Sequence, residues 1–428
     1  MLNRTRLSSL DAFGLRDQRN RIYPALEASD GSTLSLDFTA MGDTLDSRFT
    51  FTRSSTTSTY INSSGLVATA GTNVPRFDYD PTTLSPRGLL IEGSASNIAT
   101  YSNDFSNAIW TLDTSGGTIP AVSTVSQTGP DGASTVTRIT FNKTGGVFSR
   151  VRQTLSGTAS QPYTMSVWMK ANTASGGAST QNVGLRIGAD SAGFNCTVTT
   201  TWKRFQYTYT LSGTDAAAQI MLWDNIIGND ETADVLVYGC QMEAGSGASS
   251  YIPTGSSTVT RAADKLSMTN ISLMGWNQTA GTFLWDMDVQ SETNRSSYPA
   301  FAGMYRAGPV RVVRFQLNNS SGTTPRIGGD TWTAAPGAIV TGAFYTRPVG
   351  TPFKAAVAFA NTGQSMTYCI NGTVQSAVTG TGTLATPTLF LMHQDPSAAD
   401  TEYFPIHLRQ LKYWPTNLSS SDLRSITT

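Results

Sequence analysis

The sequence is poor in charge, and this shortage narrows the possible functions. Charged residues make up 14% of the 428 residues, against roughly 25% in average soluble proteins. The 29 basic and 29 acidic groups cancel, so the chain has no general electrostatic attraction to nucleic acid or to an anionic membrane surface. We therefore expect neither as a partner.

Cysteine and histidine are also scarce, and the five residues have no C-x-x-C spacing. They are Cys196, Cys240, Cys369, His393 and His407. A zinc site is therefore not expected. A serine nucleophile needs a neighbouring base, and no G-x-S-x-G motif occurs, so no catalytic residue is predicted. We expect no cofactor and no metal, with structural calcium on the acidic stretch 224–234 as the alternative.

No signal peptide or transmembrane run is present, so we expect assembly in a reducing cytoplasm and no membrane insertion. Cys196 and Cys240 fall in one predicted domain and could pair. The other interpretation is two buried reduced thiols, which suits that compartment. No repeat of about 20–50 residues is evident, which excludes a solenoid or propeller.

Serine, threonine, glycine and asparagine take the place of the missing charge, and they disfavour helices. Residues 96–262 instead hold short apolar-polar alternations separated by turn residues at about 8–12-residue spacing, typical of a β-sandwich. The predicted strands are Thr135–Phe141, Phe148–Leu155, Tyr163–Met169, Val183–Ile187, Phe205–Leu211, Ala218–Trp223 and Val235–Tyr238.

Residues 263–428 predict a second antiparallel sandwich. Phe353–Phe359 and Met366–Val374 are predicted as a strand pair, and Asn371-Gly372 within the second segment is a strong hairpin signal, because both residues tolerate positive φ. Further strands are expected at Thr282–Val289 and Ile406–Trp414. A short helix should follow the last strand, capped by Ser419, Ser420 or Ser421.

Residues 1–95 form a first section of short strands and polar loops. So small an apolar core would be marginally stable alone. We therefore expect this section to gain stability from neighbouring subunits or from a larger particle.

Several segments resemble proteins of bacteriophage particles. The order and spacing of Phe51–Ser55, Thr59-Tyr60, Asn73–Tyr79 and Arg87–Glu92 resemble the N-terminal region of tail-fibre, tail-spike and head-spike proteins. Tyr101–Trp110 and Val235–Thr254 resemble the opening and closing segments of a carbohydrate-binding jelly roll in such proteins. Residues 263–428 resemble concanavalin A-like or laminin G-like sandwiches.

This resemblance implies an all-β virion protein with an attachment module at 1–95, a carbohydrate-binding sandwich at 96–262 and a concanavalin A-like sandwich at 263–428. It implies adsorption to host surface polysaccharide by a fibre or spike, contacts with other virion proteins, and a homo-oligomer, for which we favour a trimer. The candidate attachment residues are Arg53, Arg76, Phe77, Tyr79 and Arg87.

Sugar recognition needs flat apolar faces and oriented polar groups. The candidate residues in the middle domain are Trp223, Asp224 and Asn225. Those in the last domain, expected in loops, are Tyr305, Arg306, Asp330 and Trp332. Trp168, Trp202 and Trp285 lie inside strand patterns and are interpreted as core residues.

Two other functions remain open at this point. One is a structural capsid or tail decoration protein that binds no glycan. The other is a polysaccharide hydrolase, because paired carboxylates are defined by their separation in space and not in sequence.

Overall fold

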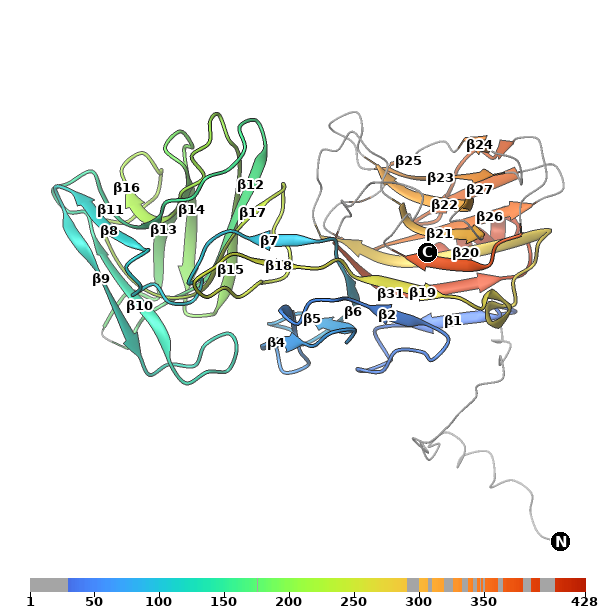
Figure 1. Ribbon diagram of the computed structural model, residues 1–428, viewed down its shortest axis with the longest axis horizontal. Coiled ribbons are helices and arrows are strands. Elements are labelled where there is room, and N and C mark those ends of the chain that lie inside the picture. The colour runs from blue at the N-terminus through green and yellow to red at the C-terminus, as the bar shows by residue number, and fades with distance from the viewer. Residues whose placement is uncertain are drawn as a thin grey trace, which may run out of the picture.

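The computed structural model describes residues 30–428 apart from 175, 291–299, 307–309, 319–325, 333–337, 342–344, 347, 349–350, 361–364, 380–385 and 393–404. Two β-sandwiches lie side by side, joined by a narrow strand pair (Figure 1). Within the described ranges the one α-helix is α1 (Ser420–Thr427), together with a 3-10 turn at Ile271–Met274. The predicted all-β class with antiparallel sandwiches is confirmed.

The middle sandwich consists of two antiparallel sheets. The first, the β17 sheet, has the order β15-β12-β17-β10-β9, and the second, the β16 sheet, has the order β14-β13-β16-β11-β8. The bounds are β8 (Thr111–Ser115), β9 (Thr118–Val125), β10 (Val136–Asn142), β11 (Phe148–Gln153), β12 (Pro162–Ala171), β13 (Thr180–Ile187), β14 (Phe194–Thr199), β15 (Lys203–Thr210), β16 (Ala218–Trp223) and β17 (Thr232–Ala244).

All seven predicted strands of the middle sandwich occur, and β8, β9 and β14 were missed. Alternation explains both results. In β16, Ala218, Ile220 and Leu222 enter the core between the sheets, so Gln219 and Trp223 face the other way. By contrast, β9 is polar and exposed for most of its length and gives no such signal.

The large sandwich is built from both ends of the chain. One sheet has the order β28-β27-β26-β20-β31-β6-β5, with β1 on β31 and β29 on β27; the other has the order β2-β19-β30-β21-β22-β23-β24, with β25 on β23. The bounds are β1 (Leu34–Asp37), β2 (Thr50–Thr52), β5 (Arg76–Tyr79), β6 (Pro86–Ile91), β19 (Lys265–Met268), β20 (Ala280–Val289), β21 (Ala300–Arg306), β22 (Val310–Asn318), β23 (Arg326–Trp332), β24 (Ala338–Thr341), β25 (Tyr345–Thr346), β26 (Phe353–Ala360), β27 (Ser365–Ile370), β28 (Thr373–Val374), β29 (Val378–Thr379), β30 (Leu389–Met392) and β31 (Ile406–Trp414).

The sequence predicted a separate module at residues 1–95. The structure shows instead that this section is part of the large sandwich. β1 and β6 pair with β31, and β2 pairs with β19. Apolar side chains of the first section, among them Leu36, Phe51 and Leu89, lie in one core with those of the last. The stabilising partner that this small section requires is thus the last section of the same chain. A small hairpin, β3 (Ser58–Ile61) with β4 (Val67–Ala70), lies outside both sheets.

The middle sandwich is consequently an insertion into the large one. β7 (Ala95–Asn97) leads in, β18 (Val259–Arg261) leads out, and the two pair antiparallel as the bridge in Figure 1. The two segments taken as its opening and closing motifs meet: Tyr101 N donates to Gly255 O at 2.7 Å, and the hydroxyl groups of Ser102 and Tyr251 are 2.7 Å apart.

The C-terminal signals are confirmed in detail. Asn371 and Gly372 have φ of 45° and 74°, which closes the hairpin between β27 and β28. Ser419 caps α1 and forms a capping box with Asp422. This helix packs Leu423 onto a small apolar cluster with Trp414 and Cys369.

The three cysteines are buried and unpaired, which decides between the two interpretations of Cys196 and Cys240. Burial raises the pKa of both thiols to about 12. They are therefore unreactive near neutral pH.

Candidate functional site

One face of the β16 sheet is turned away from the core of the middle sandwich, and we call it the outer face. Register places Trp223 opposite Phe148, and Gln219 opposite Arg152. Between these rows, Met221 lies opposite Arg150. Met221 and Gln219 are almost fully buried and form a floor, whereas Trp223, Phe148 and Arg150 are partly exposed.

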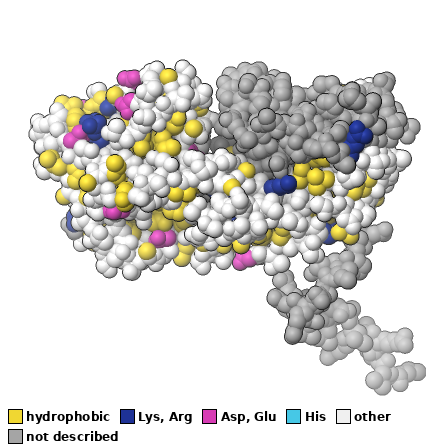
Figure 2. All heavy atoms as spheres, in the orientation of Figure 1, with side chains coloured by type: hydrophobic (Ala, Val, Ile, Leu, Met, Phe, Trp, Pro, Cys, Tyr) yellow, Lys and Arg dark blue, Asp and Glu magenta, His cyan; other side chains and the backbone are white. Residues whose placement is uncertain are grey.

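The neighbouring strands add two charged side chains to the outer face. Asp113 of β8 lies opposite Arg150, and Arg186 of β13 lies opposite Gln219. The face therefore combines aromatic rings, an amide, a carboxylate and several guanidinium groups, all on adjacent strands. Figure 2 shows basic and acidic side chains beside hydrophobic ones on the upper left of this sandwich, where Figure 1 labels β8, β11 and β16.

Hydrogen bonds hold these polar groups in fixed orientations. Arg150 donates from Nε and Nη2 to the two Asp113 oxygens at 2.6 and 2.9 Å, and from Nη1 to Gln219 Oε1 at 3.1 Å. Such bidentate pairs set the guanidinium plane as well as its position. The Arg152 Nε lies 3.7 Å from Asp113 Oδ2, beyond hydrogen-bond distance.

Arginine side chains cover the aromatic rings. The guanidinium carbon of Arg186 is 4.0 Å from the centre of the Trp223 ring, and that of Arg150 is 4.3 Å from the centre of the Phe148 ring. These are cation–π distances. The sequence predicted Trp223 as an apolar face for a sugar ring. In the structure, the guanidinium group of Arg186 covers one side of that face.

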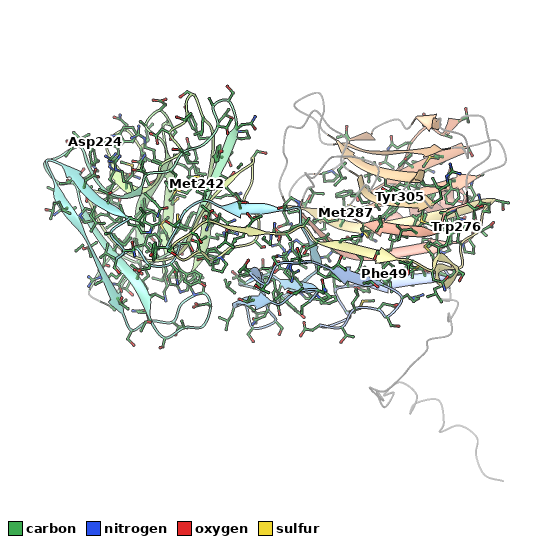
Figure 3. The ribbon with its side chains drawn as sticks, viewed as in Figure 1. Phe49, Asp224, Met242, Trp276, Met287 and Tyr305 are labelled. Atoms are coloured by element: carbon green, nitrogen blue, oxygen red, sulfur yellow. The ribbon has the colours of Figure 1, made fainter. Side chains whose placement is uncertain are left out.

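The loop after β16 brings in the other two middle-domain candidates. Asp224 and Asn225 are exposed at its start, and Figure 3 shows Asp224 at the end of the middle sandwich far from the large one. Lys143 Nζ donates to Asp224 at 2.7 Å and to Glu231 at 2.6 Å, so it ties the two ends of the loop together. Ile226 packs over Gly184 of β13, where a side chain would collide with it.

The acidic stretch 224–234 does not converge on one point. Asp230 accepts from the Asn182 backbone at 2.7 Å, and Asp234 pairs with Arg138 at 2.6 Å. In the described part of the chain, no cluster of three or more His, Cys, Asp or Glu side chains could hold a metal ion. Structural calcium stays a prediction without a site.

The candidates in the last section do not lie in loops. Tyr305 and Arg306 are the last two residues of β21. Tyr305 is fully buried, and Figure 3 shows it within the large sandwich. Asp330 and Trp332 belong to β23, and their side chains lie outside the described atoms. The structure therefore does not join this set to Trp223.

A pocket of about 300 Å³ does lie on the large sandwich, away from every predicted residue. It is lined by Asp286, Pro352, Phe353, Lys354, Asn371, Arg409, Thr427 and Thr428. Two of its charged groups pair with each other, since Arg409 Nε lies 3.3 Å from Asp286.

The candidate attachment residues divide into buried and exposed groups. Arg53, Arg76 and Phe77 are at most 3% exposed. Tyr79 is partly exposed. Arg87 is also partly exposed and forms an ion pair with Asp288 at 3.3 Å. Buried side chains serve the interior of this chain, so only Tyr79 and Arg87 are accessible to another protein.

The buried arginines belong to a network that sequence reasoning missed. Asp264 accepts from Arg53 at 3.0 Å and from Arg76, while Glu92 accepts from Arg76 at 2.7 Å and from Arg261. All five side chains are at most 2% exposed. The signal that could have found it is the presence of Arg and Asp or Glu within otherwise apolar strand segments, as in Arg87–Glu92.

Two other sequence interpretations are confirmed. Trp168 and Trp285 are core residues, and Trp202 packs beside Trp168 while its Nε1 donates to Thr128 O at 2.9 Å. His407 lies within the last strand pattern, which favours a packing role over a catalytic one, and it is buried with Nε2 2.8 Å from Asp78 while its Nδ1 has no hydrogen-bond partner. His393 lies outside the described residues.

No protein-family model and no curated protein matches this chain. Solved structures give faint likenesses. One is a heptameric SAP-like pentraxin from Limulus polyphemus, with TM-score 0.29, 10% identity and coverage of 36% of this chain and 73% of that one. Another is the receptor binding domain of a botulinum neurotoxin C/D mosaic serotype, with TM-score 0.32, 11% identity and coverage of 38% and 40%.

A third is the ligand binding domain of botulinum neurotoxin serotype D in complex with N-acetylneuraminic acid, with TM-score 0.30, 12% identity and coverage of 38% and 39%. The chain thus spans about two fifths of the length of these toxin structures. At such TM-scores the likenesses carry no argument about this chain. Over the described residues, no helix has the length and apolar character needed to cross a membrane.

Proposed function

We propose that this chain is a non-catalytic surface protein of a bacteriophage virion, a fibre or spike, that binds host glycans during adsorption. The proposed glycan binding is supported by the side chains on the outer face of the β16 sheet. Its side chains offer donors and acceptors held by mutual hydrogen bonds beside aromatic rings. Pre-oriented polar groups next to apolar surface are what recognition of a hydroxyl-rich ligand requires.

The virion part of the proposal rests on the sequence resemblance of the first section and of the segments that open and close the middle sandwich. The protein would assemble in the host cytoplasm and contact other virion proteins through its first section, where Tyr79 and Arg87 are accessible. A homotrimer would present several outer faces at once, which turns weak sugar contacts into useful avidity.

The test is binding of the intact protein to immobilised bacterial surface polysaccharides by biolayer interferometry. We expect binding to at least one polysaccharide, and a loss of about tenfold or more in Phe148→Ala/Trp223→Ala, because these rings support the guanidinium groups of Arg150 and Arg186 through cation–π contacts worth about 0.5–2 kcal/mol each. Phe194→Ala is the matched control, because Phe194 is an exposed ring that stacks on Tyr207 at the sandwich edge.

Two outcomes would favour the other functions. An antiserum that labels phage particles, combined with no polysaccharide binding, would favour a structural decoration protein. Release of reducing ends from a bound polysaccharide would establish a hydrolase and overturn the non-catalytic proposal.

A further inference from the structure

We propose that the outer face selects glycans that carry carboxylate groups, such as uronic acid residues, over neutral glycans. The inference rests on the proposed glycan binding and adds the chemical class of the ligand. It follows from three guanidinium groups on the face, those of Arg150, Arg152 and Arg186, of which Arg150 alone forms a close pair with a carboxylate, that of Asp113.

Arg152 has unused hydrogen-bonding capacity. Its side chain is 36% exposed although its Nε is buried and has no hydrogen-bond partner, and the nearest carboxylate oxygen is that of Asp113, 3.7 Å from Nε. That oxygen already accepts from Arg150 Nη2 at 2.9 Å. A second carboxylate, supplied by a ligand, would complete the pairing that Asp113 leaves unfinished, because guanidinium matches a carboxylate bidentately.

Arg186 is a second cation without a carboxylate. It donates only to main-chain carbonyls, those of Ser191 at 3.0 Å and of Ala189, and among the described residues no acidic oxygen lies within ion-pair distance. Burial and the nearby charge of Arg150 lower the pKa of Arg186, which reports crowding of like charges on this face. An anion between the two would relieve this repulsion.

The acidic groups nearest to Arg186 are Asp190 and Asp215, and both raise its pKa through space, against the effects of burial and of Arg150. Asp190 accepts from the Ser212 hydroxyl, and Asp215 accepts from the Ala217 backbone at 3.0 Å. At the other end of the face, Asp224 and Glu231 share the single ammonium group of Lys143, so one negative charge remains there. Within the rows of Arg150 and Arg152, two guanidinium groups therefore face one carboxylate, that of Asp113.

The covered rings point to the same class of ligand. A neutral pyranose needs a bare aromatic face for its C–H groups, but Arg186 and Arg150 lie over Trp223 and Phe148 at 4.0 and 4.3 Å. Both stacked guanidinium groups already donate in their own planes, Arg150 to Asp113 and Gln219 and Arg186 to main-chain carbonyls, so their positions on the face are fixed. An arginine supported in this way is suited to a planar anion and less suited to sugar stacking.

The experiment measures binding of the full chain to polygalacturonate and to the same polymer after its carboxyl groups have been activated with a carbodiimide and reduced with borohydride to neutral hydroxymethyl groups. Dextran serves as a neutral glycan and dextran sulfate as a polyanion without carboxylates. We expect polygalacturonate to bind at least tenfold more tightly than its reduced form, with affinity falling as NaCl is raised.

The variants are Arg152→Gln and Arg152→Lys, with Arg138→Gln as the control. Arg138 is a partly exposed arginine paired with Asp234 on the opposite sheet. We expect Arg152→Gln to weaken polygalacturonate binding about tenfold without affecting the thermal midpoint, Arg152→Lys to restore part of it, and Arg138→Gln to leave it unchanged. Since Arg152 makes no hydrogen bond that folding needs, its variants should fold.

The results that would contradict these expectations differ for the carboxylate inference and for the proposed glycan binding. Equal binding of native and reduced polymer, or an unchanged affinity in Arg152→Gln, would overturn the carboxylate inference and leave glycan binding intact. Equal binding of dextran sulfate at matched charge would show a general polyanion site and also overturn it. Failure to bind any of the four polymers or any surface polysaccharide would overturn the proposed function together with the inference.

Discussion

Glu92 and Glu243 are both buried, but their surroundings shift their pKa values in opposite directions. Burial alone would raise the pKa of Glu92, but the charges of Arg261 and Arg76 outweigh it and hold the pKa far below its usual range. Burial raises the pKa of Glu243, and hydrogen bonds from Ser249 and Gln241 offset this only in part. Glu92 therefore stabilises the fold as an anion, and Glu243 costs stability when it ionises.

The two glutamine variants should respond to pH in opposite ways. Glu92→Gln leaves buried arginines uncompensated and should cost about 3–5 kcal/mol at pH 7. This cost should shrink below about pH 4, since the contribution of a depressed carboxyl is lost as pH falls toward its folded pKa. Glu243→Gln should gain stability relative to the native protein as pH rises above about 4, the ordinary pKa of a glutamate, because the raised pKa of Glu243 makes its ionisation costly in the folded chain. Urea unfolding at several pH values measures both differences; parallel pH profiles would contradict the assignment.

At the scale of elements, local sequence decides ends and turns. Helix α1 begins where the Ser419 Oγ accepts from Asp422 N and the Asp422 carboxylate accepts from Ser419 N at 3.2 Å. These bonds satisfy N–H groups that a helix cannot pair internally. The helix in turn covers Cys369 and Trp414 of the large sandwich.

Removal of this cap should loosen the C-terminal helix. Ser419→Ala should lower the stability of the large sandwich by about 1 kcal/mol. Ser425→Ala, an exposed position inside the same helix, should have no effect or a slightly stabilising one. Differential scanning calorimetry of both variants checks the difference, and equal midpoints would mean that the cap contributes nothing.

At the scale of the whole molecule, the middle sandwich is inserted between β6 and β19, and a buried ion network lies at the junction. The network joins Arg53 and Arg76 of the first section with Asp264 of the last, and Ser250 next to the middle sandwich donates to Glu92 at 2.6 Å. Because every member is deeply buried, removal of one partner leaves a buried charge that neither an opposite charge nor water stabilises.

Asp264→Asn should therefore destabilise the chain by about 3–5 kcal/mol, since Asp264 accepts from Arg53, from Arg76 and from Glu92 N at 2.9 Å. We also expect the calorimetric transition of the large sandwich to separate from that of the middle one. Asp30→Asn, which removes an exposed pair with Lys412, is the matched control and should cost under about 1 kcal/mol. Equal effects of the two variants would show that burial of the network does not matter.

The sequence by itself determined the local features. Strand alternation in β16 and β20, the Asn371-Gly372 turn and the Ser419 cap depend on neighbours a few residues away, and all were predictable. Trp223 was found as a candidate because it follows an apolar strand and precedes a polar loop.

The tertiary structure alone decided which strands pair and which charges are buried. The union of β1 and β6 with β31 joins opposite ends of the chain, and Arg53 meets Asp264 across 211 positions. The outer face likewise assembles from β8, β11, β13 and β16, so Arg152 and Arg186 gained their significance only from neighbours on other strands. The physical reason is that a period of two fixes which side of a strand is apolar, while pairing depends on the total area buried by distant segments.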